Sequence, residues 1–516
     1  MVNQKKLFSD SSLSLNDFFS TNSDFLVEGF AENNPAMYEK IGAEKALKQF
    51  HQMAERVPAY RDFLKKNKIN HHKIKKIDDL KHVPWVDKEN YLKKYKLSDL
   101  CWDGKMKAPI ISASSGSSGQ PFFWPRSFNV EAETSYLYEF FIKHILGANK
   151  RKTLFINGFS MGIYIGGTFT LNCCMRLAQK GLPLTIITPG INQEEILRIV
   201  EKMGGEFEQI IIGGYPPFVR DIVDEGERRG IDWKSKVIKF VFASESLSET
   251  LRSYIYEKVG IKKSNYYTSS VNLYGTADAA LMGHEVPLSI LLRKAVGNNA
   301  ELCKKIFGEG YAPSLNQYYP FFKYIQIEND ELIFSSFNTE IPLLKYNIHD
   351  RGNILSYEKM IELLKAGGYD IKKVRELVGG QLMWHLPFVY LYGRSDFTVT
   401  LYGLNIYPEN IKMALETKEL SKLCTGKFVM ETVNLKKDQQ QRLLIHIELQ
   451  TNIKPDKAME GFIQKIIIET LRKKNSEYNH LFQTIKMKAH PELDLRLKGD
   501  TAYFAAATKQ RWVKKT

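Results

Sequence analysis

From about residue 150 to residue 273, the chain alternates short apolar runs with segments of helical spacing, and this alternation restricts the fold most. The runs, of three to six apolar residues, match strands that are buried on both faces. The segments between them place apolar residues on one helical face, as Ile196, Ile199 and Val200 do. We therefore predict βαβ units and a mostly parallel sheet flanked by helices, which binds ligands at the carboxyl ends of its strands. The predicted strands are 153–156, 184–187, 210–212, 238–242 and a run that ends at Leu273, and the predicted helices are 193–203, 218–229 and 248–259.

The pattern changes after about residue 395. Two runs, 427–433 and 443–449, predict antiparallel strands, and residues 458–473 carry an apolar stripe of helical period. Residues 485–489 are predicted to return as a strand. A β-β-α-β unit of about 120 residues has the size of a small separate α+β domain. We expect a large N-terminal domain, residues 1–394, and a small C-terminal domain, residues 395–516.

The composition is that of an ordinary globular protein. Hydrophobic residues make up 43% of the 516 residues and charged residues 25%. The five cysteines show neither metal-ligand spacing nor a secreted disulfide pattern, and the N-terminus resembles no signal peptide. No apolar run approaches the roughly 20 residues that span a bilayer. We expect a cytoplasmic protein without a membrane span.

The formal net charge is +15, from 73 basic and 58 acidic residues. Such an excess suits nucleic acid, an anionic membrane or anionic small molecules. Basic clusters such as 65–68 and 71–76 are typical of solvated faces, and the sequence carries no zinc-finger, RNA-recognition or helix-turn-helix pattern. We therefore expect no nucleic-acid partner. The oligomeric state stays open, a homodimer included.

A serine- and glycine-rich stretch precedes the alternating region. It can be a flexible connector, or a loop whose backbone N–H and hydroxyl groups converge on a phosphate. Its residues are Ser114, Ser115, Gly116, Ser117, Ser118 and Gly119.

Further polar segments follow the stretch in order. Tyr274, Gly275, Thr276 and Asp278 close a strand, and Asp350 follows an extended apolar run. The remaining segments are 392–396, 403–409 and 509–513. In isolation, Asp278 and Asp350 can each be a turn or cap acid.

Taken together, these motifs resemble the adenylate-forming superfamily of acyl-CoA synthetases, peptide-synthetase adenylation domains and luciferases. The segments 55–61 and 83–88 are most similar to phenylacetate–CoA ligase-like enzymes, and the resemblance covers about residues 40–513. It implies an α/β fold with a large AMP-binding domain, with mostly parallel sheets flanked by helices, and a small, mobile α+β lid.

The resemblance also implies a nucleotide site. The residues 114–119 would grip the β- and γ-phosphates of ATP, and Asp278, where the family usually has Glu, would hold Mg²⁺ directly or through water. Tyr274 would lie against adenine, Asp350 would accept hydrogen bonds from the ribose, and Arg394 would assist it. The remaining residues implied in this site are Ser244, Glu245, Gly275 and Thr276.

Three further roles follow from the resemblance. Lys509 would be the catalytic cation, with Lys498 as a competitor for that role. Asp396 would be the hinge and Gly403 would face coenzyme A. The segments matching the acid pocket favour an aryl or apolar acid, although many of their side chains can be core. They contain Phe159, Tyr164, Gly213, Gly214 and Tyr215.

The sequence thus predicts an acid–thiol ligase. Such an enzyme forms acyl-AMP from ATP and a carboxylic acid, releases pyrophosphate, and transfers the acyl group to coenzyme A. A nearby alternative delivers the acyl group to a carrier protein, an amine or a protein side chain. A hypothesis of another class is a non-catalytic basic protein that binds nucleotide or nucleic acid.

Overall fold

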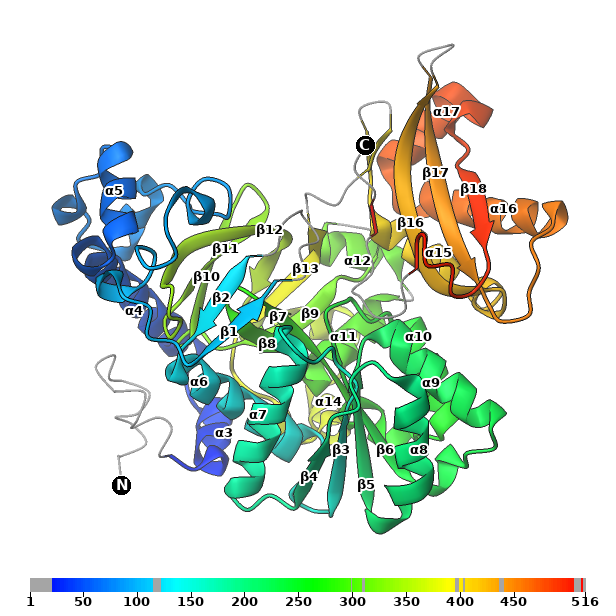
Figure 1. Cartoon of the computed structure of the whole chain (residues 1–516), viewed down its shortest axis with the longest axis horizontal. Coiled ribbons are helices and arrows are strands. Elements are labelled where there is room, and N and C mark those ends of the chain that lie inside the picture. The colour runs from blue at the N-terminus through cyan, green and yellow to red at the C-terminus, as the bar shows by residue number, and fades with distance from the viewer. Residues whose placement is uncertain are drawn as a thin grey trace.

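A long twisted sheet runs through the larger part of the molecule (Figure 1). The computed structural model describes residues 21–114, 122–297, 299–308, 311–394, 399–401, 404–435, 440–504 and 512–513. Within these residues the sheet has eleven strands, in the order β10-β11-β12-β13-β9-β8-β7-β6-β5-β3-β4. The strands are β3 (Thr153–Asn157), β4 (Leu184–Ile187), β5 (Gln209–Gly214), β6 (Val237–Ala243), β7 (Ser270–Thr276), β8 (Ala280–His284), β9 (Ser314–Tyr318), β10 (Lys323–Glu328), β11 (Glu331–Ser336), β12 (Leu343–Leu355) and β13 (Phe388–Arg394).

The half of the sheet from β7 to β4 is parallel, as the alternating pattern predicts. Successive residues of β5 face opposite layers: Ile210 and Ile212 pack with the helices α8 to α10, and Ile211 packs with α6 and α7. The predicted helices 193–203, 218–229 and 248–259 are confirmed within two residues. The helices around this half are α6 (Phe128–Glu139), α7 (Ile165–Gln179), α8 (Gln193–Met203), α9 (Pro216–Arg228) and α10 (Glu249–Val259).

The other half of the sheet, from β7 through β8 and β9 to β10, is antiparallel. The strand β12 pairs with both β11 and β13, and register shifts interrupt both pairings. The predicted α/β class is thereby confirmed, with one half of the sheet parallel and one half antiparallel.

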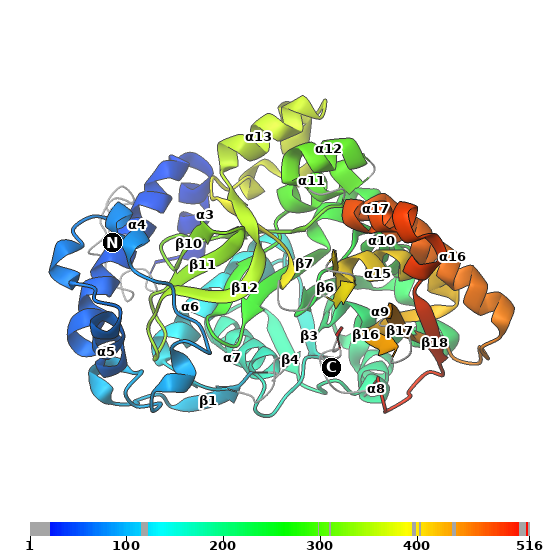
Figure 2. The ribbon, with the colours of Figure 1, turned by 90° about the horizontal axis from the view of Figure 1, so that it is seen from above.

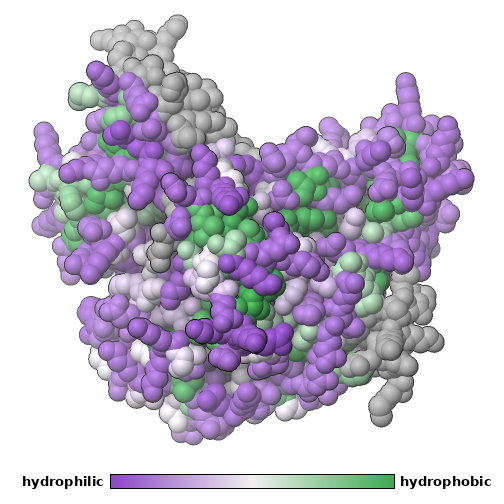
Figure 3. Space-filling model, turned by 180° about the vertical axis from the view of Figure 1, so that it is seen from behind, coloured by the Kyte–Doolittle hydropathy of each residue, from purple (hydrophilic) through white to green (hydrophobic). Residues whose placement is uncertain are grey.

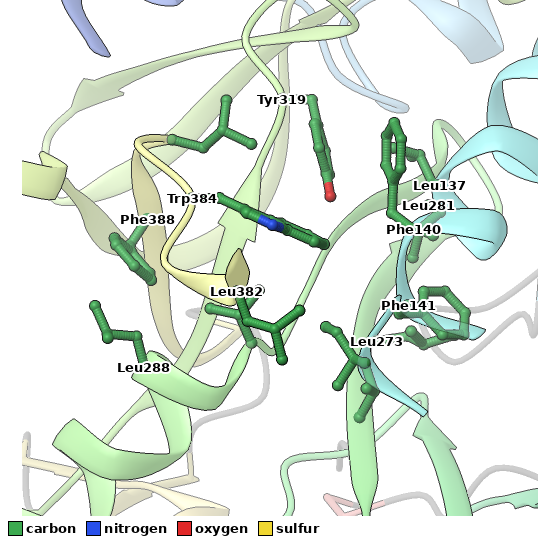
Figure 4. Close-up of a cluster of buried hydrophobic side chains, with 14 of the residues drawn as sticks. Leu137, Phe140, Phe141, Leu273, Leu281, Leu288, Tyr319, Leu382, Trp384 and Phe388 are labelled. Carbon is green, nitrogen blue, oxygen red and sulfur yellow. The ribbon is translucent and has the colours of Figure 1, made fainter. Parts of the chain in front are cut away.

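An aromatic cluster joins the sheet to the helices beneath it (Figure 4). Phe140 follows α6, and its ring lies 5.4 Å from that of Tyr319 and 6.1 Å from that of Trp384. A hairpin of β1 (Ile110–Ala113) and β2 (Phe123–Arg126) lies outside the large sheet. The other helices of this part are α3 (Ser23–Glu32), α4 (Pro35–Arg56), α5 (Pro58–Lys66), α11 (Pro287–Gly297), α12 (Ala300–Phe307), α13 (Tyr357–Ala366) and α14 (Ile371–Val378).

The described residues from 399 onward, here the C-terminal region, form two further sheets that stand over α9 and α10 (Figures 1 and 2). The strands β16 and β17 are antiparallel, as predicted, and α16 buries Ile463, Ile467 and Leu471 beneath them. The chain passes from β13 to this region through residues 395–398, which lie outside the described residues, so the boundary at 394/395 stays a prediction. The elements are β14 (Val399–Leu401), β15 (Leu404–Ile406), α15 (Pro408–Leu415), β16 (Cys424–Leu435), β17 (Gln440–Leu449), α16 (Lys457–Lys474), α17 (Ser476–Ile485) and β18 (Glu492–Arg496).

The strand predicted at residues 485–489 is wrong. The helix α17, capped by Asn475, ends at residue 485, and a 3-10 turn (Lys486–Ala489) follows it. The third strand is β18, which pairs in parallel with β17 and places Leu493 beside Ile445. The apolar residues of 485–489 terminate a helix, whereas the period-two alternation of a strand begins only at residue 492.

Hydrophilic side chains cover most of the face shown in Figure 3, with separate apolar patches between them. In the described part of the chain, we find no helix with both the length and the apolar character needed to cross a bilayer.

Candidate active site

The stem of the serine- and glycine-rich loop is closed by hydrogen bonds. The backbone N–H of Ser114 donates to the carbonyl oxygen of Phe122 at 2.9 Å, and the N–H of Phe122 donates to Ser114 Oγ at 2.9 Å. The residues Ser115, Gly116, Ser117, Ser118 and Gly119 lie outside the described residues. The hairpin β1–β2 therefore fixes where the loop leaves and re-enters the fold.

Asp278 is buried close to this hairpin. Its Oδ2 accepts a hydrogen bond of 2.6 Å from the hydroxyl of Tyr346 in β12, and its Oδ1 lies 3.2 Å from Lys88 Nζ. The Lys88 ammonium also lies 6.0 Å from the centre of the Trp124 ring in β2. Lys88 thus joins the loop hairpin to the predicted metal ligand. The turn before Asp278 is closed by Thr276, whose hydroxyl accepts a hydrogen bond from Ala279 N–H at 3.0 Å.

The role of Lys88 was not predicted, although the segment 83–88 was singled out. The available signal was its place in that segment, next to Asp87. The Asp87 carboxylate accepts a hydrogen bond of 2.6 Å from Asn90 N–H, and the Asn90 side chain accepts one of 2.8 Å from Asp87 N–H. Asp87 also lies 3.4 Å from His349, which raises the pKa of that imidazole. These contacts hold the segment against β12.

The structure brings together Tyr274 and Asp350, which are 76 positions apart. The Tyr274 hydroxyl donates to Asp350 Oδ2 at 2.6 Å, and both residues are buried. Tyr274 lies near the end of β7, where Gly275 is backed by the carbonyl of Ala280. Asp350 pairs through its backbone with Arg394, whose side chain lies outside the described part. Tyr274 and Asp350, the predicted contacts of adenine and ribose, are therefore joined by a hydrogen bond.

The segment after β6 carries the next predicted contacts. Ser244 is exposed and has a φ of 72°, so the chain turns sharply there. Lys412 of α15 donates from Nζ to the carbonyl oxygen of Ser246 at 2.5 Å and lies 3.9 Å from Glu245 Oε2. The C-terminal region therefore touches the large sheet at the carboxyl end of β6.

The predicted acid-pocket residues do not share one environment. Phe159 is buried, and a Cβ added to Gly213 would lie 3.0 Å from its ring, so this ring is part of the core. The Tyr215 hydroxyl lies 2.9 Å from Ser160 Oγ. Tyr164 is exposed and is bridged to the end of β1. Gly214 packs against Val219 of α9.

The two candidate lysines can be compared only in part. Lys498 Nζ lies 4.0 Å from Asp221 Oδ1 of α9. Lys509, Asp396 and Gly403 lie outside the described residues. Near Lys509 in the chain, Trp512 accepts a hydrogen bond of 2.8 Å at its carbonyl from Met430 N–H.

Protein-family models and curated proteins give no match to this sequence. Solved structures do. A crystal structure of 2-hydroxyisobutyryl-CoA ligase in the postadenylation state, in complex with R3-HIB-AMP, is similar at a TM-score of 0.62 and 14% identity, over 94% of this chain and 90% of that one. An open conformation of that ligase with 2-HIB-AMP and CoA has a TM-score of 0.53, also at 14% identity, over 94% of this chain and 92% of the other. The thioesterification state has a TM-score of 0.50 at the same identity, over 90% and 87% of the two chains. The chain therefore shares its fold with an acyl-CoA ligase over nearly its whole length.

Proposed function

From this fold and site, we propose that the protein is an ATP-dependent acid–thiol ligase that joins a carboxylic acid to coenzyme A through acyl-AMP. One observation carries the proposal: the Lys88–Asp278 pair lies between Trp124 of the loop hairpin and Tyr346 of β12, and Tyr274, which donates to Asp350, packs in the same buried cluster as Trp124 and Tyr346. These groups match the needs of a nucleotide, which has an anionic triphosphate and a neutral ribose.

Each group has a role in nucleotide binding. An ionised Asp350 accepts hydrogen bonds from the ribose hydroxyls, as it now accepts one from Tyr274. The N–H and hydroxyl groups of residues 114–119 bind phosphate oxygens, and the ammonium of Lys88 faces the same anion. The residues Ser244, Glu245, Gly275, Thr276 and Arg394 border the base and the ribose.

Asp278 offers the hard oxygen ligand that Mg²⁺ prefers. Among the residues that the structure describes, no three His, Cys, Asp or Glu side chains converge as a metal site. Asp278 would therefore hold the ion together with phosphate and water oxygens, sharing its carboxylate between Mg²⁺ and Lys88. The ion would supply positive charge to the phosphates.

In the first step, the substrate carboxylate attacks the α-phosphorus of ATP, the acyl–phosphate bond forms and pyrophosphate leaves. Lys509 is the cation that stabilises the charge on both reacting groups. It precedes Trp512 by three positions, so chain length keeps the two Cα atoms within about 11 Å. The ring of Trp512 lies 5.5 Å from Lys412 Nζ, which contacts the segment after β6. These contacts of Trp512 support the catalytic role of Lys509 over the alternative that Lys509 belongs to a basic tail.

In the second step, the sulfur of coenzyme A attacks the acyl carbon, the acyl–phosphate bond breaks as AMP leaves, and the thiol proton passes to solvent. Rotation of the C-terminal region about Asp396 would withdraw Lys509 and bring Gly403 to the site. An aryl or apolar acid stays our proposal for the substrate, with Tyr164 and Tyr215 at the wall and Phe159 behind it. All five cysteines lie in the described part of the chain as buried thiols, which supports a reducing, cytoplasmic location.

A panel of carboxylic acids in an ATP–pyrophosphate exchange assay tests the proposal. We expect exchange with at least one acid, and a loss of at least about 100-fold in Lys509→Ala. Lys498→Ala is the matched control and is expected to slow the exchange no more than about fivefold, far less than Lys509→Ala does. Full exchange by Lys509→Ala with none by Lys498→Ala would reverse the two assignments.

Product analysis separates the alternatives. Thioester formed with coenzyme A supports the proposed acceptor, whereas transfer only to a carrier-protein thiol or an amine supports another. A non-catalytic basic protein would show no exchange with any acid, and steeply salt-dependent binding to RNA or DNA.

A further inference from the structure

The helix α9 directs two adjacent charged side chains into the C-terminal region. Arg220 is buried, and its guanidinium donates to the carbonyl oxygens of Ser421 and, at 3.3 Å, of Thr425. Within its own helix, Arg220 reaches only Asp224, at 3.5 Å. These two donations therefore join α9 to a part of the chain about two hundred residues away.

Asp221, the next residue, faces two lysines of the C-terminal region. Its carboxylate lies 3.8 Å from Lys427 Nζ and 4.0 Å from Lys498 Nζ. Burial at this contact raises the pKa of Asp221, and the two lysines and Arg220 oppose that rise. Glu448 lies behind the lysines, 3.5 Å from Lys427, and accepts a hydrogen bond of 2.9 Å from Gly499 N–H.

A second contact lies beside the first. Lys412 of α15 binds the carbonyl of Ser246, which follows β6, and α9 follows the neighbouring strand β5. In a parallel sheet, the carboxyl ends of adjacent strands lie at the same edge, which is the ligand edge. Figure 2 shows α15 and β16 above α9 and α10. The C-terminal region is therefore docked on the edge that carries the proposed site.

The first contact also holds the start of the segment that follows β18. Lys498 and Gly499 begin this segment, and Tyr503 stacks on His446 of β17 with 3.9 Å between ring centres. The segment reaches β16 at Val513, which is bridged to Met430. Lys509 belongs to the same stretch of sequence, between Tyr503 and Val513.

We infer that Arg220, Asp221, Lys427 and Lys498 form a latch that holds the C-terminal region in the position required for adenylation. They are positioning residues, and the role in adenylation rests on the proposed function. The ion pairs are long and partly exposed, as an interaction that must open before the second step requires. Lys498, the competitor for the catalytic role, thereby acquires a different task.

Distance measurement tests the latch without any substrate. The native cysteines are all buried, so cysteines introduced at the exposed Lys202 of α8 and Lys457 of α16 can be labelled selectively. We call a molecule closed when its C-terminal region is docked as described above, and open when the latch is broken. We expect Asp221→Asn to lower the ratio of closed to open molecules about two- to fivefold, and Arg220→Gln to lower it about tenfold. Sodium chloride should reduce the closed fraction of the wild type and have less effect on Asp221→Asn, because salt screens the ion pairs.

The matched control is Glu227→Gln, which removes a charge from the same helix. Glu227 pairs with Lys258 of α10, within the predicted large domain. The control should have the wild-type distances and salt response. Identical distances in the wild type, Asp221→Asn and Arg220→Gln would overturn the latch.

Activity adds a second readout, with an acid that supports exchange. Asp221→Asn is expected to slow ATP–pyrophosphate exchange about two- to fivefold, in step with the lost closed fraction, and to leave thioester formation from supplied acyl-AMP unchanged or faster. Equal slowing of both steps would contradict the inference. If no acid supports exchange in the wild type, the proposed function fails, while the distance measurements still decide whether the latch exists.

Discussion

At the scale of single residues, the Asp278 carboxylate is held by two side chains, those of Lys88 and Tyr346. A buried carboxylate needs a counter-charge or hydrogen bonds, and Asp278 has both, from Lys88 and Tyr346. The same ammonium is a suitable contact for a phosphate. Lys88 therefore has two tasks that mutagenesis can separate.

We predict that Lys88→Met lowers the free energy of unfolding by about 2 kcal/mol, because it leaves Asp278 buried and uncompensated. The double variant Lys88→Met/Asp278→Asn should recover most of that stability, since it buries no lone charge. Both variants should bind ATP at least about tenfold more weakly than the wild type. Thermal unfolding and calorimetric titration with ATP measure the two effects. A double variant that regains ATP affinity along with stability would show that Lys88 does not contact the phosphates.

A second prediction concerns the pair of Tyr274 and Asp350. Asp350→Asn should weaken ATP binding about tenfold or more, because a neutral amide replaces the acceptor of the ribose hydroxyls. Tyr274→Phe removes only the hydroxyl that orients Asp350 and should cost less, about two- to fivefold. A deoxyribose nucleotide should bind the wild type and Asp350→Asn with similar affinity. A preserved preference for ribose in Asp350→Asn would contradict the assignment.

At the scale of elements, the junction between β13 and α15 is unusually tight. Gly393 has a φ of 127°, and an added Cβ would overlap the carboxylate of Glu409 in the first turn of α15. The adjoining Arg351 of β12 has its guanidinium 4.6 Å from the Tyr407 ring centre. The strand end and the helix start are thus packed through a position that admits no side chain.

We predict that Gly393→Ala lowers the free energy of unfolding by about 2–4 kcal/mol, through backbone strain and steric overlap together. The control Gly368→Ala has a φ of 82° with open space around it, so it should cost only about 1 kcal/mol. Chemical denaturation measures both. Adding Glu409→Ala to Gly393→Ala should restore the steric part of the loss and leave the backbone part. Equal losses in the two glycine variants would show that Glu409 does not occupy this space.

Periodicity explains which elements the sequence could predict. The strands β3, β5 and β6 are largely buried on both faces, β4 lies at the edge of the sheet, and amphipathic helices separate all four, so their existence and parallel direction follow from local patterns. The antiparallel half depends on pairings such as β9 with β13, between residues about seventy positions apart, which no local pattern encodes. The site residues differ for the same reason. Local motifs indicated Tyr274, Asp278 and Asp350. The role of Lys88 depends on a partner 190 positions away, which no local motif indicates.

At the scale of the whole molecule, the C-terminal region contacts the large sheet at two places, its ligand edge and the end of β13. The latch and Lys412 contact the segments after β5 and β6, and Glu409 lies where the region begins, beside Gly393. Movement of the region would change all of these contacts together, because each of them joins the C-terminal region to the large sheet or to its helices. Solution conditions that alter any of them should alter the closed state.

The last prediction uses the titration of Glu409. Burial raises the pKa of this carboxyl from 4.5 to about 7, and Lys412 and Arg351 only partly oppose the rise. The folded protein therefore retains a proton that the unfolded chain releases between pH 4.5 and 7. This contribution to stability is complete below pH 4.5, falls as the pH rises, and is lost above about pH 7.

The variant Glu409→Gln removes the titration but keeps the size of the side chain. The wild type should thus lose on the order of 2–3 kcal/mol relative to Glu409→Gln between pH 4.5 and 8, as measured by denaturation at each pH. A difference that stays constant across this range would mean that Glu409 is solvated at the junction. Since Gly393 and α15 enclose the carboxylate, we expect instead that the junction is held most firmly under mildly acidic conditions and loosens near neutrality, where the C-terminal region must move.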